Sequence, residues 1–134
     1  MTCNMLAIQV AKLQINETVL TALFQTALAR NALTALLQQQ TGVAMTAYAY
    51  SDGRTLVLNA YNVSITVRAD GSVTVRAVSN ADTQRFTAAV QSAIAQVAGV
   101  LVQNMIAQTL QAAGVPVVAD EYTAAGSRVM TLRL

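Results

Sequence analysis

The sequence predicts an α+β fold, a two-layer sandwich in which two helices cover one face of a mostly antiparallel sheet. Segments with alternating apolar and polar residues, typical of half-buried strands, are separated by two long segments with apolar residues at helical spacing. Short turn signals join most of the strands directly, as antiparallel neighbours require. The 134 residues are therefore predicted to form a single α+β domain, residues 1–134, with the order β-α-ββββ-α-ββ.

The first element is a predicted strand over residues 5–13, in which Leu6, Ile8 and Val10 share one face. The opening stretch "MTCNMLAIQVAKLQ" has no basic start, and polar residues interrupt its short apolar run. A secretory signal needs a basic start followed by an apolar core. We therefore expect no signal peptide. The single cysteine of the chain fits a reducing setting, so a cytoplasmic location is expected.

A helix is predicted next, because Asn16 and Glu17 suit a helix N-terminus and Thr41-Gly42 suits its end. Its apolar residues lie on two faces. The first face holds Leu20, Leu23, Phe24, Ala27 and Leu28, and the second holds Leu33, Leu36 and Leu37. This change of face has two explanations: the helix breaks around Arg30-Asn31, or it is buried on two sides.

Two hairpins form the four-stranded meander that follows. In the first, Ser51-Asp52-Gly53 turns between strands over residues 44–50 and 54–60. Three consecutive apolar residues, 56–58, predict that the second of these strands is central and buried on both faces. Tyr61-Asn62 turns the chain into the next hairpin.

The second hairpin, "NVSITVRADGSVTVRA", admits two registers. A two-residue loop at Asp70-Gly71 would mix charged and apolar side chains on both faces. A three-residue loop, Ala69-Asp70-Gly71, instead gathers the apolar residues on one face. It places Val67 opposite Val73, Ile65 opposite Val75 and Val63 opposite Ala77, and it leaves Ser64, Thr66, Arg68, Ser72, Thr74 and Arg76 on the other face. We predict the three-residue loop.

A long helix follows, in a stretch without any charged residue from Phe86 to Ala119. Asn80 or Asp82 is expected to cap it, and Gly114 with Pro116 to end it. One apolar face comprises Phe86, Val90, Ala93, Ile94, Val97, Leu101 and Met105, and a second comprises Val102, Ile106 and Leu110. The second face is rotated by roughly 100° from the first. Either the helix bends near Gly99 and both faces enter one core, or it is straight and the second face meets another surface.

The same stretch has the length of a membrane span, which needs about 20 predominantly apolar residues. Side-chain amides interrupt it at Gln91, Gln96, Gln103, Asn104, Gln108 and Gln111. An amide without a partner in lipid costs several kcal/mol. We therefore predict that the helix does not cross a membrane.

The last predicted element is a hairpin in which "VPVVADEY" and "RVMTLRL" pair about Ala124-Ala125-Gly126. Its inward side is expected to hold Met130, Leu132 and Leu134. Asp120 and Glu121 are adjacent acidic residues, and neighbours in a strand point to opposite faces. We therefore predict an exposed hairpin edge there rather than a metal site.

The composition excludes several classes of chemistry. The chain has no histidine, which rules out Ser-His-Asp triads, Cys-His pairs and histidine metal sites within one chain. Cys3 is the single cysteine, so no disulfide forms within the chain. No glycine motif for phosphate binding occurs. We assign no catalytic residue, no metal ligand and no cofactor, and we lean against an enzyme.

Nucleic-acid binding receives little support from the distribution of charge. The net charge is only +2 and the basic residues form no run, whereas nucleic-acid-binding proteins usually cluster lysine and arginine. Arg68 and Arg76 share the polar face of one hairpin, but the four tyrosines lie elsewhere in the sequence. We interpret this face as solvated and do not expect nucleic acid as a partner.

Three segments resemble the Ycf35-like family of plastid, cyanobacterial and other bacterial proteins. They are "MTCNMLAIQVAKLQINETVLTAL", "YNVSITVRADGSVTVRAVS" and "LVQNMIAQTLQAAGVPVVADEYTAAGSRVMTLRL". They look like that family's opening strand and helix, its central hairpin, and its closing helix and hairpin. The family's Arg-Gly-Tyr segment before the meander is replaced here by "TAYAY". The resemblance implies the fold, but no catalytic residue, because the family's function is unknown.

Scarcity of charge gives the leading functional hypothesis. Only 10% of the residues are charged, against about 25% in ordinary soluble domains. Together with two apolar faces on each helix, this predicts a non-catalytic, self-associating structural or adaptor protein, as a homo-oligomer or a larger assembly. Its expected interface residues are Leu33, Leu37, Val102, Ile106 and Leu110. The alternative is a small-ligand-binding domain or enzyme with an apolar pocket between sheet and helices, contacted by Tyr48, Tyr50 and Arg54.

Overall fold

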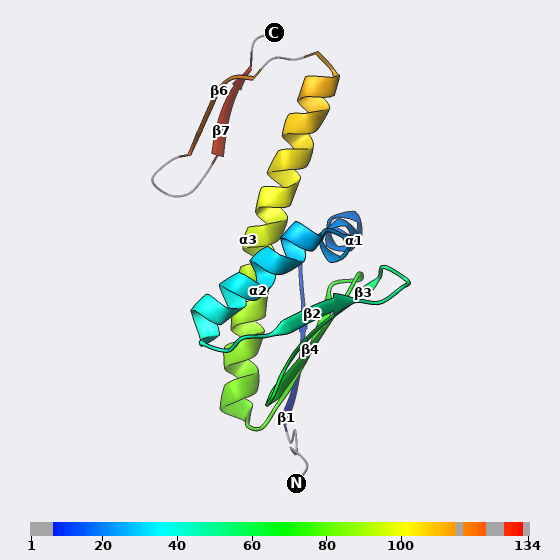
Figure 1. Cartoon of the computed structure of the whole chain (residues 1–134), viewed down its shortest axis with the longest axis vertical. Coiled ribbons are helices and arrows are strands. Elements are labelled where there is room, and N and C mark those ends of the chain that lie inside the picture. The colour runs from blue at the N-terminus through cyan, green and yellow to red at the C-terminus, as the bar shows by residue number, and fades with distance from the viewer. Residues whose placement is uncertain (1–6, 115–116, 123–127, 133–134) are drawn as a thin grey trace. The chain divides into compact units, whose positions relative to one another are not determined.

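The computed structural model describes residues 7–114, 117–122 and 128–132, and side-chain surroundings for residues 7–114. It confirms the α+β fold: a five-stranded antiparallel sheet is combined with helices (Figure 1). The chain forms two compact units, Met1–Ala98 and Gly99–Leu134, where the sequence predicts one domain.

The N-terminal unit contains the five-stranded sheet. In chain order its elements are β1 (Ala7–Lys12), α1 (Glu17–Gln25), α2 (Ala27–Thr41), β2 (Thr46–Ala49), β3 (Thr55–Ala60), β4 (Val63–Arg68), β5 (Ser72–Ala77) and the first part of α3 (Asn80–Ala112). The spatial order of the strands is β1-β5-β4-β3-β2, and every neighbouring pair is antiparallel. The first strand of the chain is therefore added beside the last strand of the meander, and β1 and β2 form the two edges.

The register of the β4–β5 hairpin is the predicted one. Val67 pairs with Val73, Ile65 with Val75 and Val63 with Ala77, as a three-residue loop requires. Gly71 has a φ of 95°, in the left-handed region, and its N–H donates to the carbonyl of Arg68. The three-residue turn therefore produces the register that the hydrophobic pattern predicts.

The two faces of this sheet have different surroundings. One face is buried and forms the core with the inward side chains of the helices. Its fully buried residues include Leu56, Leu58, Val63, Ile65, Val67, Val73, Val75 and Ala77. The opposite face carries the hydroxyl and arginine side chains of β4 and β5, which are half-buried or exposed. We call this second side the open face; the sheet and its helices therefore form two layers.

In β3 the prediction of burial on both faces is confirmed. Leu56 and Leu58 face the helices, and Val57, which points to the open face, is only 4% exposed. Val57 lies between Tyr48 of β2 and Thr66 of β4 in the pairing register. Side chains from the two neighbouring strands therefore flank it.

β1 presents its apolar side in an unexpected direction. Ile8 and Val10 are 59% and 68% exposed, because they pair with Arg76 and Thr74 on the open face. Ala7 and Ala11 take the inward positions, and Ala7 is buried. Ile8 and Val10 do share one face, but that face is not the core.

The predicted first helix is two helices, and the break lies at Thr26 rather than at Arg30-Asn31. Thr26 has extended backbone angles, and its hydroxyl donates to the carbonyl of Ala22. Arg30 donates from its guanidinium to the carbonyl of Phe24, at 2.5 Å. The break leaves carbonyls at the end of α1 without helical partners, and Arg30 satisfies one of them.

The ends of these two helices match the sequence prediction. The side chain of Asn16 accepts a hydrogen bond from the N–H of Thr18 and caps α1. Gly42, at the end of α2, has a φ of 74° and donates its N–H to the carbonyl of Gln38. Both features are the local signals for a helix start and stop.

α3 begins at a different cap from the predicted ones. The hydroxyl of Ser79 accepts the N–H of Asp82 at 3.2 Å, and the carbonyl of Ser79 accepts the N–H of Thr83. Ser79 therefore holds the position predicted for Asn80 or Asp82. The helix continues through Gly99 to Ala112, and Gly114 follows it with a φ of 77°.

The C-terminal unit contains the rest of α3 and the hairpin formed by β6 (Val117–Tyr122) and β7 (Arg128–Leu132). The two strands pair antiparallel with a register shift between Val117 and Ala119, and they form a separate two-stranded sheet. The last hairpin is thus confirmed, but it does not join the sheet of the N-terminal unit. The predicted inward direction of Met130, Leu132 and Leu134 lies outside the described side chains.

Candidate functional site

Burial along α3 changes abruptly at Ala98. Between Thr83 and Ala98 the helix contributes nine buried residues, and from Gly99 to Ala112 it contributes none. Both halves are rich in apolar side chains. A soluble helix normally buries its apolar side, whereas the described second half of α3 contains no fully buried residue.

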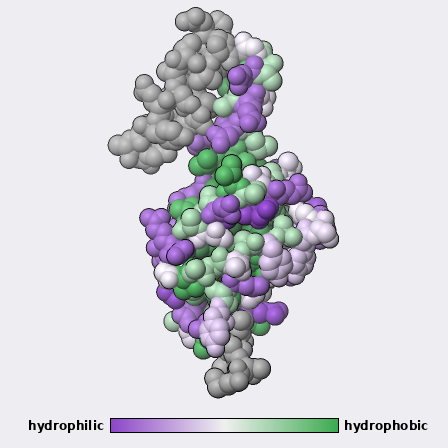
Figure 2. Space-filling view, viewed as in Figure 1, coloured by the Kyte–Doolittle hydropathy of each residue, from purple (hydrophilic) through white to green (hydrophobic). Residues whose placement is uncertain are grey.

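Within that half, the second predicted face defines the candidate site. Val102, Ile106 and Leu110 follow i, i+4 spacing, and we call these three residues the α3 surface. Ile106 is 46% exposed, and Val102 and Leu110 are half-buried. Met105 and Val100 add exposed apolar area on other sides of the helix. Figure 2 shows hydrophobic residues of α3 at the molecular surface.

The α3 surface is uncharged. The last charged residue before it is Arg85, and the next after it is Asp120. Its flanks carry Gln103 and Thr109, and the hydroxyl of Thr109 donates to the carbonyl of Met105 at 2.9 Å. Such a surface offers apolar contact and amide hydrogen bonds, but no group that transfers a proton at neutral pH.

Leu33 and Leu37, which the sequence analysis assigns to the same interface, lie elsewhere. Both are 0% exposed and belong to the core of the N-terminal unit. The break at Thr26 turns α2 so that its second apolar face points inward, while Leu28 of the first face is exposed. This part of the interface prediction is therefore corrected, because fully buried side chains are not available to a partner.

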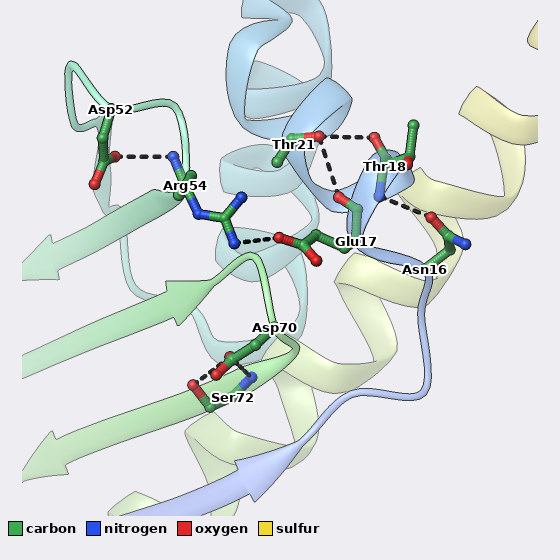
Figure 3. Close-up of polar contacts among 8 residues, drawn as sticks. All are labelled: Asn16, Glu17, Thr18, Thr21, Asp52, Arg54, Asp70 and Ser72. Atoms are coloured by element: carbon green, nitrogen blue, oxygen red, sulfur yellow. Dashed lines mark hydrogen bonds and ion pairs between the residues drawn. The ribbon is translucent and has the colours of Figure 1, made fainter.

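The three residues expected to line a ligand pocket are not brought together between sheet and helices. Tyr48 pairs with Val57, so its ring lies on the open face. The rings of Tyr48 and Tyr50 stack with 6.0 Å between centroids and an angle of 24°. Arg54 instead forms an ion pair with Glu17 at the start of α1 (Figure 3). The predicted pocket is thus corrected: the tyrosines point away from the helices.

The polar contacts in Figure 3 stabilise turns and caps. Asp52 accepts the N–H of Arg54 at 2.8 Å, inside the β2–β3 turn. Asp70 accepts both the N–H and the hydroxyl of Ser72, at 2.8 and 2.7 Å. These two donors hold the pKa of the Asp70 carboxyl below its usual value. Both aspartates stabilise local structure, as is typical of aspartate at turn positions.

The open face brings together residues that sequence reasoning kept apart. One row of paired residues runs across all five strands, from Tyr48 through Val57, Thr66 and Thr74 to Val10. A second row holds Arg76 opposite Ser64, with Ile8 beyond. Alternation along β4 and β5 predicts the arginines of this face. The tyrosines could not be placed beside them, because the order of strands in the sheet is not a local property.

Within the described residues, no group of three His, Cys, Asp or Glu side chains could hold a metal ion. α3 is the one described helix long and apolar enough to cross a membrane by length and composition. Of its most apolar 18-residue window, 44% is buried inside the protein. Core helices pass the same test, so this finding supports no membrane location by itself.

Comparison with protein-family models, with curated proteins and with solved structures found no match. The resemblance to the Ycf35-like family therefore stays a prediction.

Proposed function

We propose that the protein is a non-catalytic structural or adaptor protein that associates with copies of itself through the α3 surface. The observation that carries this proposal is the end of burial at Ala98 in a helix that stays apolar to Ala112. Burying apolar surface contributes about 25 cal/mol per Å². A partner for Val102, Ile106 and Leu110 is therefore favourable.

A second copy suits this surface for a physical reason. In a two-fold symmetric pair each surface meets itself, so any charge on the surface near the axis would face the same charge. The α3 surface has none. Gln103 on its flank carries both donors and an acceptor, so two copies of this amide can bond to one another.

A lipid bilayer suits the same segment less well. A single helix that spans a bilayer meets lipid on every side, so Gln103, Gln108 and Gln111 would all face lipid there. Each unpartnered amide costs several kcal/mol there. In a protein interface these amides find partners or remain at the hydrated rim.

The proposal is tested by the solution mass of the purified chain, measured by light scattering after size-exclusion chromatography. We expect a mass well above the 14.1 kDa of one chain. We also expect it to persist at high salt, because apolar contacts are not screened. Ile106→Asp places a charge at the centre of the α3 surface and should give a folded monomer.

Gln108→Asp is the matched control, since it adds the same charge about 200° around the same helix. It should keep the mass of the unmodified chain, and circular dichroism should show both variants folded. A monomeric unmodified chain would refute the proposal. An Ile106→Asp variant that keeps the full mass would refute the role of the α3 surface.

A further inference from the structure

We infer that the open face of the five-stranded sheet binds a single-stranded nucleic acid. This differs from the expectation from the sequence, because strand pairing places Tyr48 on the same face as Arg68 and Arg76. This inference concerns a different surface from self-association and does not depend on it. The strand order β1-β5-β4-β3-β2 and the pairing register place basic and aromatic residues from four strands on one side of the sheet. They are Tyr48 of β2, Tyr50 directly after β2, Arg68 of β4, Arg76 of β5, and Lys12 of β1.

The charge of this face is positive. Lys12, Arg68 and Arg76 are all exposed, and the strand positions that share the face carry no carboxylate. Asp70, in the β4–β5 turn, lies near Lys12 and Arg68 and stays ionised, because the hydrogen bonds from Ser72 hold the pKa of its carboxyl below its usual value. Asp70 offsets one of the three positive charges, so the face together with its turn keeps a net positive charge. Three cations facing three identical cations disfavour a copy of the same face, and they favour an anionic chain.

The aromatic part of the face suits a base. Tyr48 and Tyr50 are both about half exposed, and their rings stack on one another to form a small platform at the edge of the sheet. Exposed aromatic rings on a cationic surface are the feature on which unpaired bases stack. A duplex keeps its bases stacked on each other, so this platform favours a single strand.

The remaining side chains complete a polar track between platform and cations. Ser64, Thr66, Ser72 and Thr74 lie on the open face between β2 and β1. Arg68 lies across this track, with its guanidinium 3.5 Å from the hydroxyl of Thr74. Hydroxyl groups donate to and accept from phosphates and sugars. Neighbouring strands are about 4.8 Å apart, so β4, which carries Arg68, lies roughly 10 Å from β2, which carries Tyr48. Arg68 is therefore within reach of a phosphate that flanks a base stacked on the tyrosines.

An anionic membrane fits the face less well than a nucleic acid. On the open face β4 and β5 carry serine, threonine and arginine, and Val57 of β3 is only 4% exposed. The exposed aliphatic residues Ile8 and Val10 both lie on β1, at one edge of the sheet. Membrane-surface binding relies on buried apolar area together with basic charge. We therefore expect an anionic membrane to bind this face less tightly than a single-stranded nucleic acid does.

The test is fluorescence anisotropy of a labelled oligouridylate of about 12 nucleotides, a length within the usual site sizes. We expect binding that weakens with salt, with a slope of about −2 in log K against log salt for three cations on a single strand. Arg76→Thr should make that slope shallower by about 0.7. Tyr48→Thr should lower the affinity about tenfold, through loss of base stacking.

Two control variants remove an arginine and a tyrosine that lie outside the open face. Arg85→Gln deletes one positive charge in the first turns of α3, and Tyr61→Thr deletes an exposed tyrosine in the β3–β4 turn. Both should bind like the unmodified chain, and thermal melts should show all four variants folded. Ile106→Asp should also bind normally, so that failure of self-association and failure of this inference give different results.

Three outcomes would overturn the inference. One is no change in anisotropy at about millimolar protein and low salt, above the dissociation constants of ordinary non-specific binding. A second is an equal loss of affinity in Arg85→Gln and Arg76→Thr, which would reflect net charge alone. The third is binding to phosphatidylglycerol vesicles that the oligouridylate does not compete away, which would assign the face to a membrane.

Discussion

Gly71 is the residue at which the turn between β4 and β5 and the end of β1 come together. Its φ of 95° lies in the left-handed region, and a Cβ there would be 2.7 Å from the carbonyl oxygen of Leu13. The carbonyl of Gly71 accepts the N–H of Leu13, also at 2.7 Å. Glycine is therefore required at position 71 for two reasons: the left-handed backbone angle and the close approach of the chain at the end of β1.

Gly71→Ala should destabilise the protein more than Gly42→Ala does. Gly42 also has a left-handed φ, of 74°, but a Cβ there would meet nothing within 4 Å. We expect about 1–2 kcal/mol for Gly42→Ala, from the backbone angle alone, and about 2–5 kcal/mol for Gly71→Ala, with overpacking added. Urea denaturation of both variants measures the difference, and equal losses would contradict the close approach.

The break between α1 and α2 shows how an element is set by contacts beyond its own sequence. Hydrophobic spacing predicts that the helix changes face and suggests a break near Arg30-Asn31. In the structure Arg30 instead belongs to α2 and bonds back to the carbonyl of Phe24. The break at Thr26 allows the inward residues of both helices to reach one core, which helical spacing alone does not reveal.

Leucine-to-alanine substitutions on α2 test this orientation. Leu33 is 0% exposed and Leu28 is 81% exposed. Leu33→Ala should cost about 2–5 kcal/mol of the free energy of unfolding, because it leaves a cavity. Leu28→Ala should change that free energy by at most about 0.5 kcal/mol. Similar losses of unfolding free energy for the two variants in a urea titration would contradict the break at Thr26.

Two compact units make up the whole chain, and the proposed association involves the second part of a helix that both units share. Association stabilises the folded state by mass action, so the stability of an oligomer depends on protein concentration. A chain with only 10% charged residues has few charged side chains to keep copies apart. Self-association should therefore change the midpoint of thermal unfolding as well as the solution mass.

The midpoint of thermal unfolding should rise by several degrees over a roughly hundredfold increase in protein concentration. Ile106→Asp should make the midpoint independent of concentration, while Gln108→Asp should leave the dependence intact. Differential scanning calorimetry at several concentrations makes this measurement. A midpoint that does not move for the unmodified chain would contradict an oligomer that forms in the tested range.

Features that rest on local geometry can be predicted from the amino-acid sequence alone. Side chains in a strand alternate with a period of two, so the pattern around Ala69-Asp70-Gly71 allowed one register, and the structure has it. The cap at Asn16 and the stop at Gly42 also follow from short-range hydrogen bonding and backbone angles. The fold class and the second apolar face of α3 were predictable for the same reason.

The surfaces that these elements share depend on tertiary packing. Pairing of β1 with β5 turned Ile8 and Val10 outward, and pairing of β2 with β3 put Tyr48 on the face of the arginines. Leu33 and Leu37 entered the core, while Ile106 stayed exposed. The apolar faces of these elements look alike in sequence. Burial depends on which distant segment covers a face, and that is a property of the packed chain rather than of any one stretch of it.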